Sequence, residues 1–128
     1  MAQVQAPPSV APSAHVLVVE DDPILMMALV EFVEDAGCVA IEASTAAEAI
    51  GILEARLDIR AVLTDLDMRG SSAGMTLAAA IRHRWPPIDL LMVSSQPWDA
   101  AQVPARGLVL GKPFDRRRIV AALQKFAA

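Results

Sequence analysis

From His15 onward, short apolar runs alternate with longer stretches in which apolar residues recur at the spacing of a helix. This alternation is typical of an α/β fold with a parallel sheet, because the crossover between two parallel strands usually forms a helix. Five rounds of the alternation fill the chain and predict five strands. The apolar runs that we expect to form them are 16–19, 39–43, 61–63, 90–93 and 108–110.

The residues at the ends of the helical stretches are typical of helix caps. Asp22 before Pro23 predicts an N-cap followed by proline at the first helical position, and Gly37 predicts the end of that helix. Thr45 and Glu48 form a capping-box pattern at the start of the second helix. The helical spacing predicts these core-facing side chains: Leu25, Leu29, Phe32, Ala36, Ala49, Ile50, Leu53, Leu77, Ala80, Ile81, Ile119, Val120, Leu123 and Phe126.

Two segments interrupt the alternation. Residues 1–14 are uncharged and contain three prolines, so we expect a disordered leader there and one folded domain over 15–128. Pro97 and Pro104 leave only six residues between them, and Pro104 steers the residue before it away from helical geometry. A fourth helix at this place should therefore be short or absent.

Length and composition limit the class of protein. With 128 residues, 55% of them hydrophobic, the chain supplies enough material for one domain with its own core. The longest apolar run, Ile24 to Val30, is far shorter than the roughly 18 residues that span a bilayer. The first basic residue is Arg56, so no secretory signal is expected, and the single Cys38 is expected to be a small core residue. A cytoplasmic protein without a membrane segment is predicted.

The charges are distributed unevenly along the chain. Residues 1–64 carry ten acidic and two basic residues, whereas residues 65–128 carry five acidic and nine basic residues. Neither half is basic enough for a dedicated nucleic-acid binder, and the arginines are not interleaved with aromatic residues. Direct contact with nucleic acid is not expected.

Charged or hydroxyl side chains follow four of the five predicted strands. Glu20 and Asp21 follow the first strand, Asp65 the third, Ser94 the fourth and Lys112 the fifth. Because the C-terminal ends of parallel strands share one edge of the sheet, these residues should converge there. Taken singly, each has an ordinary explanation as a cap, a turn former or a solvated residue. Their occurrence together in one chain is what predicts a site.

The acidic residues at that edge require a cation. Two like charges about 5 Å apart repel by roughly 3 kcal/mol at an effective dielectric constant of about 20. Carboxylate oxygens with room for water suit Mg²⁺. Lys112 would pair with Asp65 before a reaction and with phosphoryl oxygens after it, and Ser94 would donate a hydrogen bond to the same oxygens. A carboxylate nucleophile, a metal and a lysine are the groups that in-line phosphoryl transfer requires.

Over residues 15–126 the chain resembles the response-regulator receiver family of two-component signalling. The motifs that carry this resemblance are Val18-Val19-Glu20-Asp21-Asp22, Leu63-Thr64-Asp65-Leu66-Asp67-Met68, Met92-Val93-Ser94-Ser95 and Lys112-Pro113-Phe114. The resemblance implies a flavodoxin-like, doubly wound sheet of five parallel strands in the order 2-1-3-4-5, with helices on both faces.

The resemblance also implies the chemistry of the site. Asp65 would accept a phosphoryl group from a histidine kinase or a phosphotransfer protein, and Ser94 would follow that group as the switch residue. The peptide bond between Lys112 and Pro113 would be cis. The Mg²⁺ ligands implied are the carboxylates of Glu20, Asp21 and Asp65 and the backbone carbonyl of Asp67.

Three positions depart from the family pattern. Arg69 stands where proline is usual, and Ala73 stands where an acidic residue is usual, which puts the shape of the loop after the third strand in doubt. Val109 replaces a frequent aromatic residue three positions before Lys112. We therefore expect no aromatic side chain to couple to Ser94.

These features predict a single-domain response regulator that is not an enzyme, beyond catalysing its own phosphorylation and dephosphorylation. It would act by docking to a downstream protein or by passing the phosphoryl group along a relay, as a monomer or a weak dimer. Two alternatives stay open. One is a receiver-like scaffold that is never phosphorylated. The other is an aspartate-dependent phosphatase of the haloacid dehalogenase type, which the order of the acidic motifs disfavours.

Overall fold

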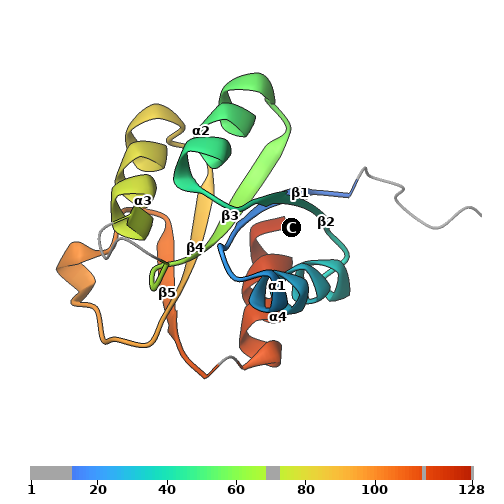
Figure 1. The fold of residues 1–128 in the computed structure, drawn as a ribbon, viewed down its shortest axis with the longest axis vertical. Helices are drawn as coiled ribbons and strands as arrows, with labels where there is room; N and C mark the ends of the chain where they lie inside the picture. Colours follow the sequence, from blue (N-terminus) through green and yellow to red (C-terminus); the bar gives the residue numbers. More distant parts are fainter. Residues whose placement is uncertain (1–12, 69–72, 114, 128) are drawn as a thin grey trace, which may run out of the picture.

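The computed structural model describes residues 13–68, 73–113 and 115–127 (Figure 1). The expected leader therefore lies outside the described residues except for Ser13 and Ala14, and Arg69 lies outside them as well. Five parallel strands form one sheet, as the sequence pattern predicts, and their order β2-β1-β3-β4-β5 is the one that the resemblance implies. Their bounds are β1 His15–Val19, β2 Val39–Ala43, β3 Ile59–Asp65, β4 Asp89–Ser94 and β5 Gly107–Gly111.

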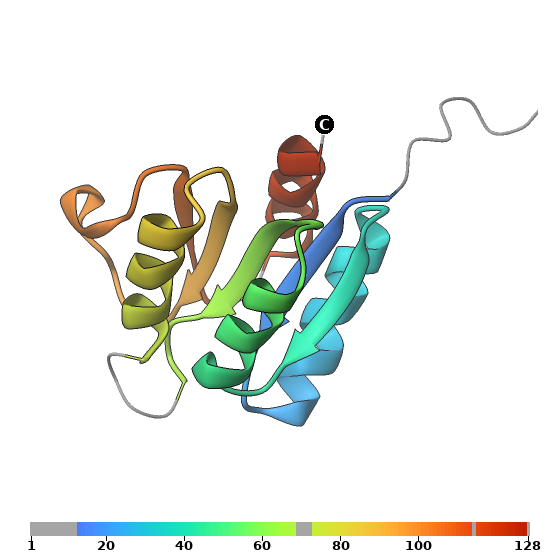
Figure 2. The same ribbon diagram turned by 90° about the horizontal axis from the view of Figure 1, so that it is seen from above.

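Helices cover both faces of this sheet. Their bounds are α1 Pro23–Asp35, α2 Ala46–Ala55, α3 Ala73–Arg84 and α4 Arg116–Ala127. In Figures 1 and 2, α1 and α4 lie side by side on one face, while α2 and α3 lie together on the other. Side chains of alternate strand positions therefore form two separate hydrophobic clusters, one under each helix pair. The flavodoxin-like fold is thus confirmed.

The ends of α1 are formed as the sequence predicts. The Asp22 side chain accepts a hydrogen bond from the Ile24 N–H at 2.9 Å, so it is the N-cap before Pro23. At the other end Gly37 has a φ of +82°, a value that favours glycine. The Cys38 N–H then donates to the Val33 carbonyl at 3.1 Å, which adds a bond to a carbonyl of the last helical turn.

The buried faces of two helices differ from the prediction. In α1 the fully buried residues are Met26, Leu29 and Val33. The expected Leu25, Phe32 and Ala36 pack against the same core cluster but are only half-buried. Every residue from 24 to 30 is apolar, so the pattern contains no polar positions that would fix which side faces the core. In α3 the alanine that is fully buried is Ala78, and the expected Ala80 is half-buried.

The connection between β4 and β5 contains no α-helix among its described residues. A single 3₁₀ turn, Ala100–Gln102, takes that place, and the Asp99 side chain caps it by accepting from the Ala101 N–H at 3.0 Å. The expectation of a short or absent fourth helix is confirmed. Cys38 is buried, as expected of a core residue. None of the helices in the described part of the chain is long and apolar enough to cross a membrane.

Candidate functional site

The register of the sheet brings the predicted site residues to one edge. Val19 pairs with Thr64, so Glu20 and Asp65 follow on adjacent strands. Asp65 in turn pairs with Val93, immediately before Ser94. On the next strand Ser94 pairs with Gly111, and the Lys112 N–H donates to the Ser94 carbonyl at 2.8 Å. The central strand β3 therefore holds Asp65 between the other groups.

Asp65 is the centre of this arrangement. It is 3% exposed, and its Oδ2 accepts from Lys112 Nζ at 3.0 Å. Its Oδ1 accepts from the Asp67 N–H at 2.8 Å. Burial disfavours the charged form of Lys112, but the bonds and charges of Asp67 and Asp65 outweigh burial and raise the pKa of the ammonium. Lys112 is thus a fixed cation beside a buried carboxylate, and its peptide bond to Pro113 is cis, as expected.

Glu20 has one carboxylate oxygen without a partner. The residue is 2% exposed, and its Oε2 accepts from the Asp22 N–H at 3.0 Å, while its Oε1 is buried and has no hydrogen bond. Burial first, and then the neighbouring Asp65 and Asp21 carboxyl groups, raise the pKa of Glu20 to about 8. This is the electrostatic situation that a cation relieves, so the site fits Mg²⁺.

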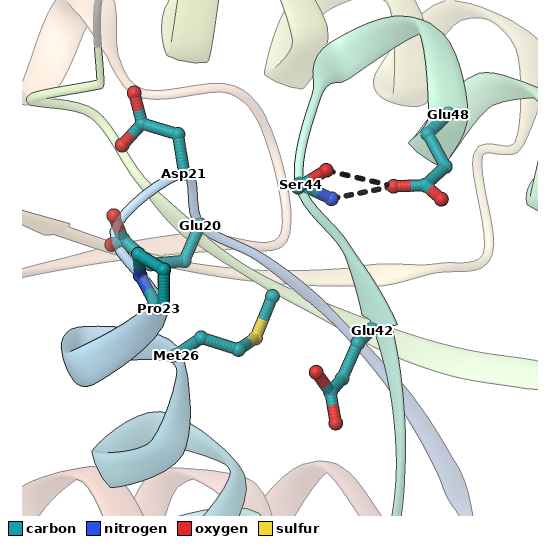
Figure 3. Close-up of a pocket in the computed structure, with 7 residues that line it drawn as sticks. All are labelled: Glu20, Asp21, Pro23, Met26, Glu42, Ser44 and Glu48. Atoms are coloured by element: carbon teal, nitrogen blue, oxygen red, sulfur yellow. Dashed lines mark hydrogen bonds between the residues drawn. The ribbon is translucent and has the colours of Figure 1, made fainter.

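A pocket with a volume of about 280 Å³ opens beside Glu20 (Figure 3). Four acidic side chains line it: Glu20 and Asp21 after β1, Glu42 from β2 and Glu48 from α2. Within the described residues, however, no three His, Cys, Asp or Glu side chains are grouped as a ready metal site. A cation here would be held by few side chains and would keep several waters, which is the usual habit of Mg²⁺.

The Asp67 side chain binds other site residues, which the sequence did not predict. Only its backbone carbonyl was expected in the site, yet its Oδ2 lies 3.0 Å from Lys112 Nζ and accepts from the Ser95 N–H at 2.8 Å. Its Oδ1 accepts from the Ser94 hydroxyl at 3.1 Å. Asp67 lies in the turn that follows β3, where its N–H donates to Asp65 Oδ1 at 2.8 Å, and the signal available in the sequence was a second carboxylate only two residues after Asp65.

The expectation that no aromatic side chain couples to Ser94 is wrong. Trp98 Nε1 donates to the Ser94 hydroxyl oxygen at 2.9 Å. The prediction considered only position 109 on β5, where Val109 does pack against the core cluster on the α2 and α3 face. The short β4–β5 connection instead folds back after Ser94 and brings Trp98 to it from four residues further on.

Gly74 at the start of α3 lies against the backbone that carries Asp65. A Cβ placed on Gly74 would come within 2.8 Å of the Leu66 Cα and 3.0 Å of the Asp65 carbonyl oxygen. Neither contact is with a flexible side chain, so the backbone would have to shift. The helix start thus fixes the position of the site strand. The neighbouring departure, Ala73, is the first residue of α3.

Comparisons with known proteins agree with this geometry. The family model of the response regulator receiver domain matches residues 16–124. A response regulator receiver protein from Pseudomonas putida is 29% identical, with a TM-score of 0.78 over 91% of this chain and 99% of that one. A receiver protein from Sinorhizobium medicae, 24% identical, has a TM-score of 0.80 over 91% and 95% of the two chains and supports the fold alone. No match was found among curated proteins.

Proposed function

Because this chain belongs to the response regulator receiver domain family, we propose that it accepts a phosphoryl group on Asp65 and signals through a protein partner. The observation that carries this proposal is the Asp65 carboxylate, which is almost fully buried and held 3.0 Å from Lys112 Nζ. The unpartnered Glu20 oxygen beside it supports a requirement for a cation. The donor is a histidine kinase or a phosphotransfer protein, and the domain is a signalling module without an external substrate.

In the proposed reaction, a carboxylate oxygen of Asp65 attacks the phosphorus of a phosphohistidine. The new P–O bond forms as the P–N bond breaks, and the imidazole nitrogen keeps the electron pair and takes a proton from solvent. The product is an acyl phosphate on Asp65. Little covalent chemistry is asked of the protein, so catalysis consists mainly of positioning and charge neutralisation.

The surrounding groups supply that neutralisation. Lys112 pairs with a phosphoryl oxygen, and the Ser94 hydroxyl donates to another. Glu20, Asp21, Asp65 and the backbone carbonyl of Asp67 would hold Mg²⁺, which contributes further positive charge beside the transferred group. Because Asp65 and Glu20 are buried, the effective dielectric constant around them is low, and the attraction between opposite charges is stronger than in water.

Phosphorylation then changes the surface that a partner contacts. The phosphoryl group adds about −1.5 to −2 charges at the sheet edge. The connection between β4 and β5 lies next to it, contains few internal hydrogen bonds among its described residues and is tied to Ser94 through Trp98. We propose that this connection changes conformation and that a downstream protein recognises it. A cytoplasmic monomer or weak dimer fits this use.

The test is incubation with a small phosphodonor and Mg²⁺, followed by intact-mass measurement. Wild type should gain one phosphoryl group, and Asp65→Asn should gain none. The matched control is Asp99→Asn, which removes a carboxylate from the cap of the 3₁₀ turn and should still be modified. Equal modification of Asp65→Asn would contradict the assignment. No modification of wild type would favour a receiver-like scaffold, and continuing phosphate release would favour a phosphatase.

A further inference from the structure

The Asp67 carboxylate binds the groups that a phosphoryl group on Asp65 would need. Its two oxygens accept from Ser94 Oγ at 3.1 Å and from the Ser95 N–H at 2.8 Å, and one of them lies 3.0 Å from Lys112 Nζ. These are three donors on one small anion. Ser94 and Lys112 are the donors that the proposed function assigns to phosphoryl oxygens, so Asp67 and the phosphoryl group would compete for them.

Asp67 is negatively charged in this position. It forms an ion pair with Lys112 and accepts hydrogen bonds from Ser94 and Ser95, all of which favour the charged carboxylate. A dianionic phosphoryl group on the neighbouring Asp65 would therefore meet a like charge as well as a competitor. The Ser94 hydroxyl has one proton to donate, so it can serve only one of the two anions, and Lys112 would have to be shared between them and Asp65.

The two carboxylates differ in their freedom to move. The side chain of Asp65 is 4% exposed, whereas that of Asp67 is 25% exposed. A cavity of about 350 Å³ lies next to Asp67 and is lined also by Ser94 and Trp98. Asp67 can turn away from Lys112 toward water or into this space, but Asp65 cannot.

We propose that the Asp67 carboxylate occupies the place of the phosphoryl oxygens in the unphosphorylated protein and must leave when Asp65 is phosphorylated. This inference rests on the proposed function. It makes Asp67 a positioning residue that sets how readily the site accepts a phosphoryl group. Its departure also releases the Ser94 hydroxyl, which at present donates to Asp67 and accepts from the Trp98 indole.

The experiment measures binding of beryllium fluoride, a noncovalent phosphoryl mimic, to Asp67→Asn. The Mg²⁺ affinity of each protein is measured first, so that every titration is made at saturating Mg²⁺. The asparagine keeps the shape and one acceptor oxygen but removes the charge, so the mimic should bind about tenfold more tightly or better than to wild type. Asp67→Ala should show the same direction, and Asp99→Asn, the matched control, should bind like wild type.

A second readout separates this role from a merely structural one. The amide resonance of Ser95 reports its bond to the Asp67 carboxylate, so it should move in wild type when the mimic binds and should already be displaced in Asp67→Ala, which has no acceptor there. Unchanged or weaker mimic binding in both Asp67 variants, with normal binding in wild type, would overturn this inference alone. Failure of wild type to bind the mimic would overturn the proposed function together with it.

Discussion

Replacing Glu20 by Gln should stabilise the protein at neutral pH when a chelator keeps Mg²⁺ away. The glutamine keeps the shape, can accept the Asp22 N–H bond and can donate its amide toward Asp65, but it cannot become an anion. In wild type the same position must hold either an ionised carboxylate among other carboxylates or a proton taken up from solvent. Both carry a free-energy cost that glutamine avoids.

The size of the effect follows from the pKa of Glu20, which burial and the Asp65 and Asp21 carboxyl groups raise from its ordinary value of 4.5 to about 8. Between these two values, the unfolded chain has lost the proton and the folded chain keeps it, so the unfolding free energy falls as pH rises. The cost is about 1 kcal/mol near pH 5 and about 3 kcal/mol near pH 7. A buried acceptor without a partner, as Glu20 Oε1 is, independently costs about 1 to 3 kcal/mol.

The assay is urea unfolding of wild type and Glu20→Gln at several pH values in the presence of chelator. The unfolding free energy of the variant should exceed that of wild type by about 2 to 3 kcal/mol near pH 7, and this difference should shrink toward pH 5. Glu34→Gln, on the exposed side of α1, is the matched control for the loss of one glutamate charge. A gap that does not depend on pH, or a variant less stable than wild type near pH 7, would refute the reasoning.

Two further predictions concern the neighbouring groups. Asp21→Ala should weaken Mg²⁺ binding far more than Asp22→Ala, because Asp22 caps α1. Titration of both variants with Mg²⁺ checks this. Equal losses of affinity would mean that the metal ligands are wrongly assigned. In a Trp85→Phe background, the fluorescence of Trp98 should shift when Mg²⁺ and beryllium fluoride bind, because its bond partner Ser94 then turns toward the mimic. An unchanged spectrum would favour α4 as the responsive element instead.

The positions of the main site residues could be predicted because they depend on topology. Glu20 and Ser94 follow an apolar run directly, and Asp65 and Lys112 follow one after a single intervening residue. Parallel strands bring such positions to one edge whatever the details of packing. The short connection before β5 was equally predictable, because proline excludes helix locally. Local chemistry and a small set of topologies thus determine both features.

Other features could not be predicted, because they depend on which of several neighbouring groups forms a given hydrogen bond. Lys112 lies 3.0 Å from a carboxylate oxygen of both Asp65 and Asp67, and no sequence pattern states that it is shared. The contact of Trp98 with Ser94 depends on how a loop without regular structure folds back onto the sheet. The buried face of α1 was only partly predicted for a different reason, since residues 24–30 are all apolar and several helix orientations bury similar area.

The arrangement of charge links ligand binding at this edge to the state of the β4–β5 connection. Lys112 is shared between two carboxylates, and Glu20 has a buried oxygen without a partner, so the unphosphorylated site is short of positive charge. A phosphoryl group on Asp65 would deepen that shortage, which either a bound cation or the departure of Asp67 would reduce. By thermodynamic linkage, cation binding and the departure of Asp67 would each favour phosphorylation, and phosphorylation would favour each of them. Asp67 also accepts from Ser94, and Ser94 accepts from Trp98. The departure of the Asp67 carboxylate would therefore alter the hydrogen bonds of the β4–β5 connection.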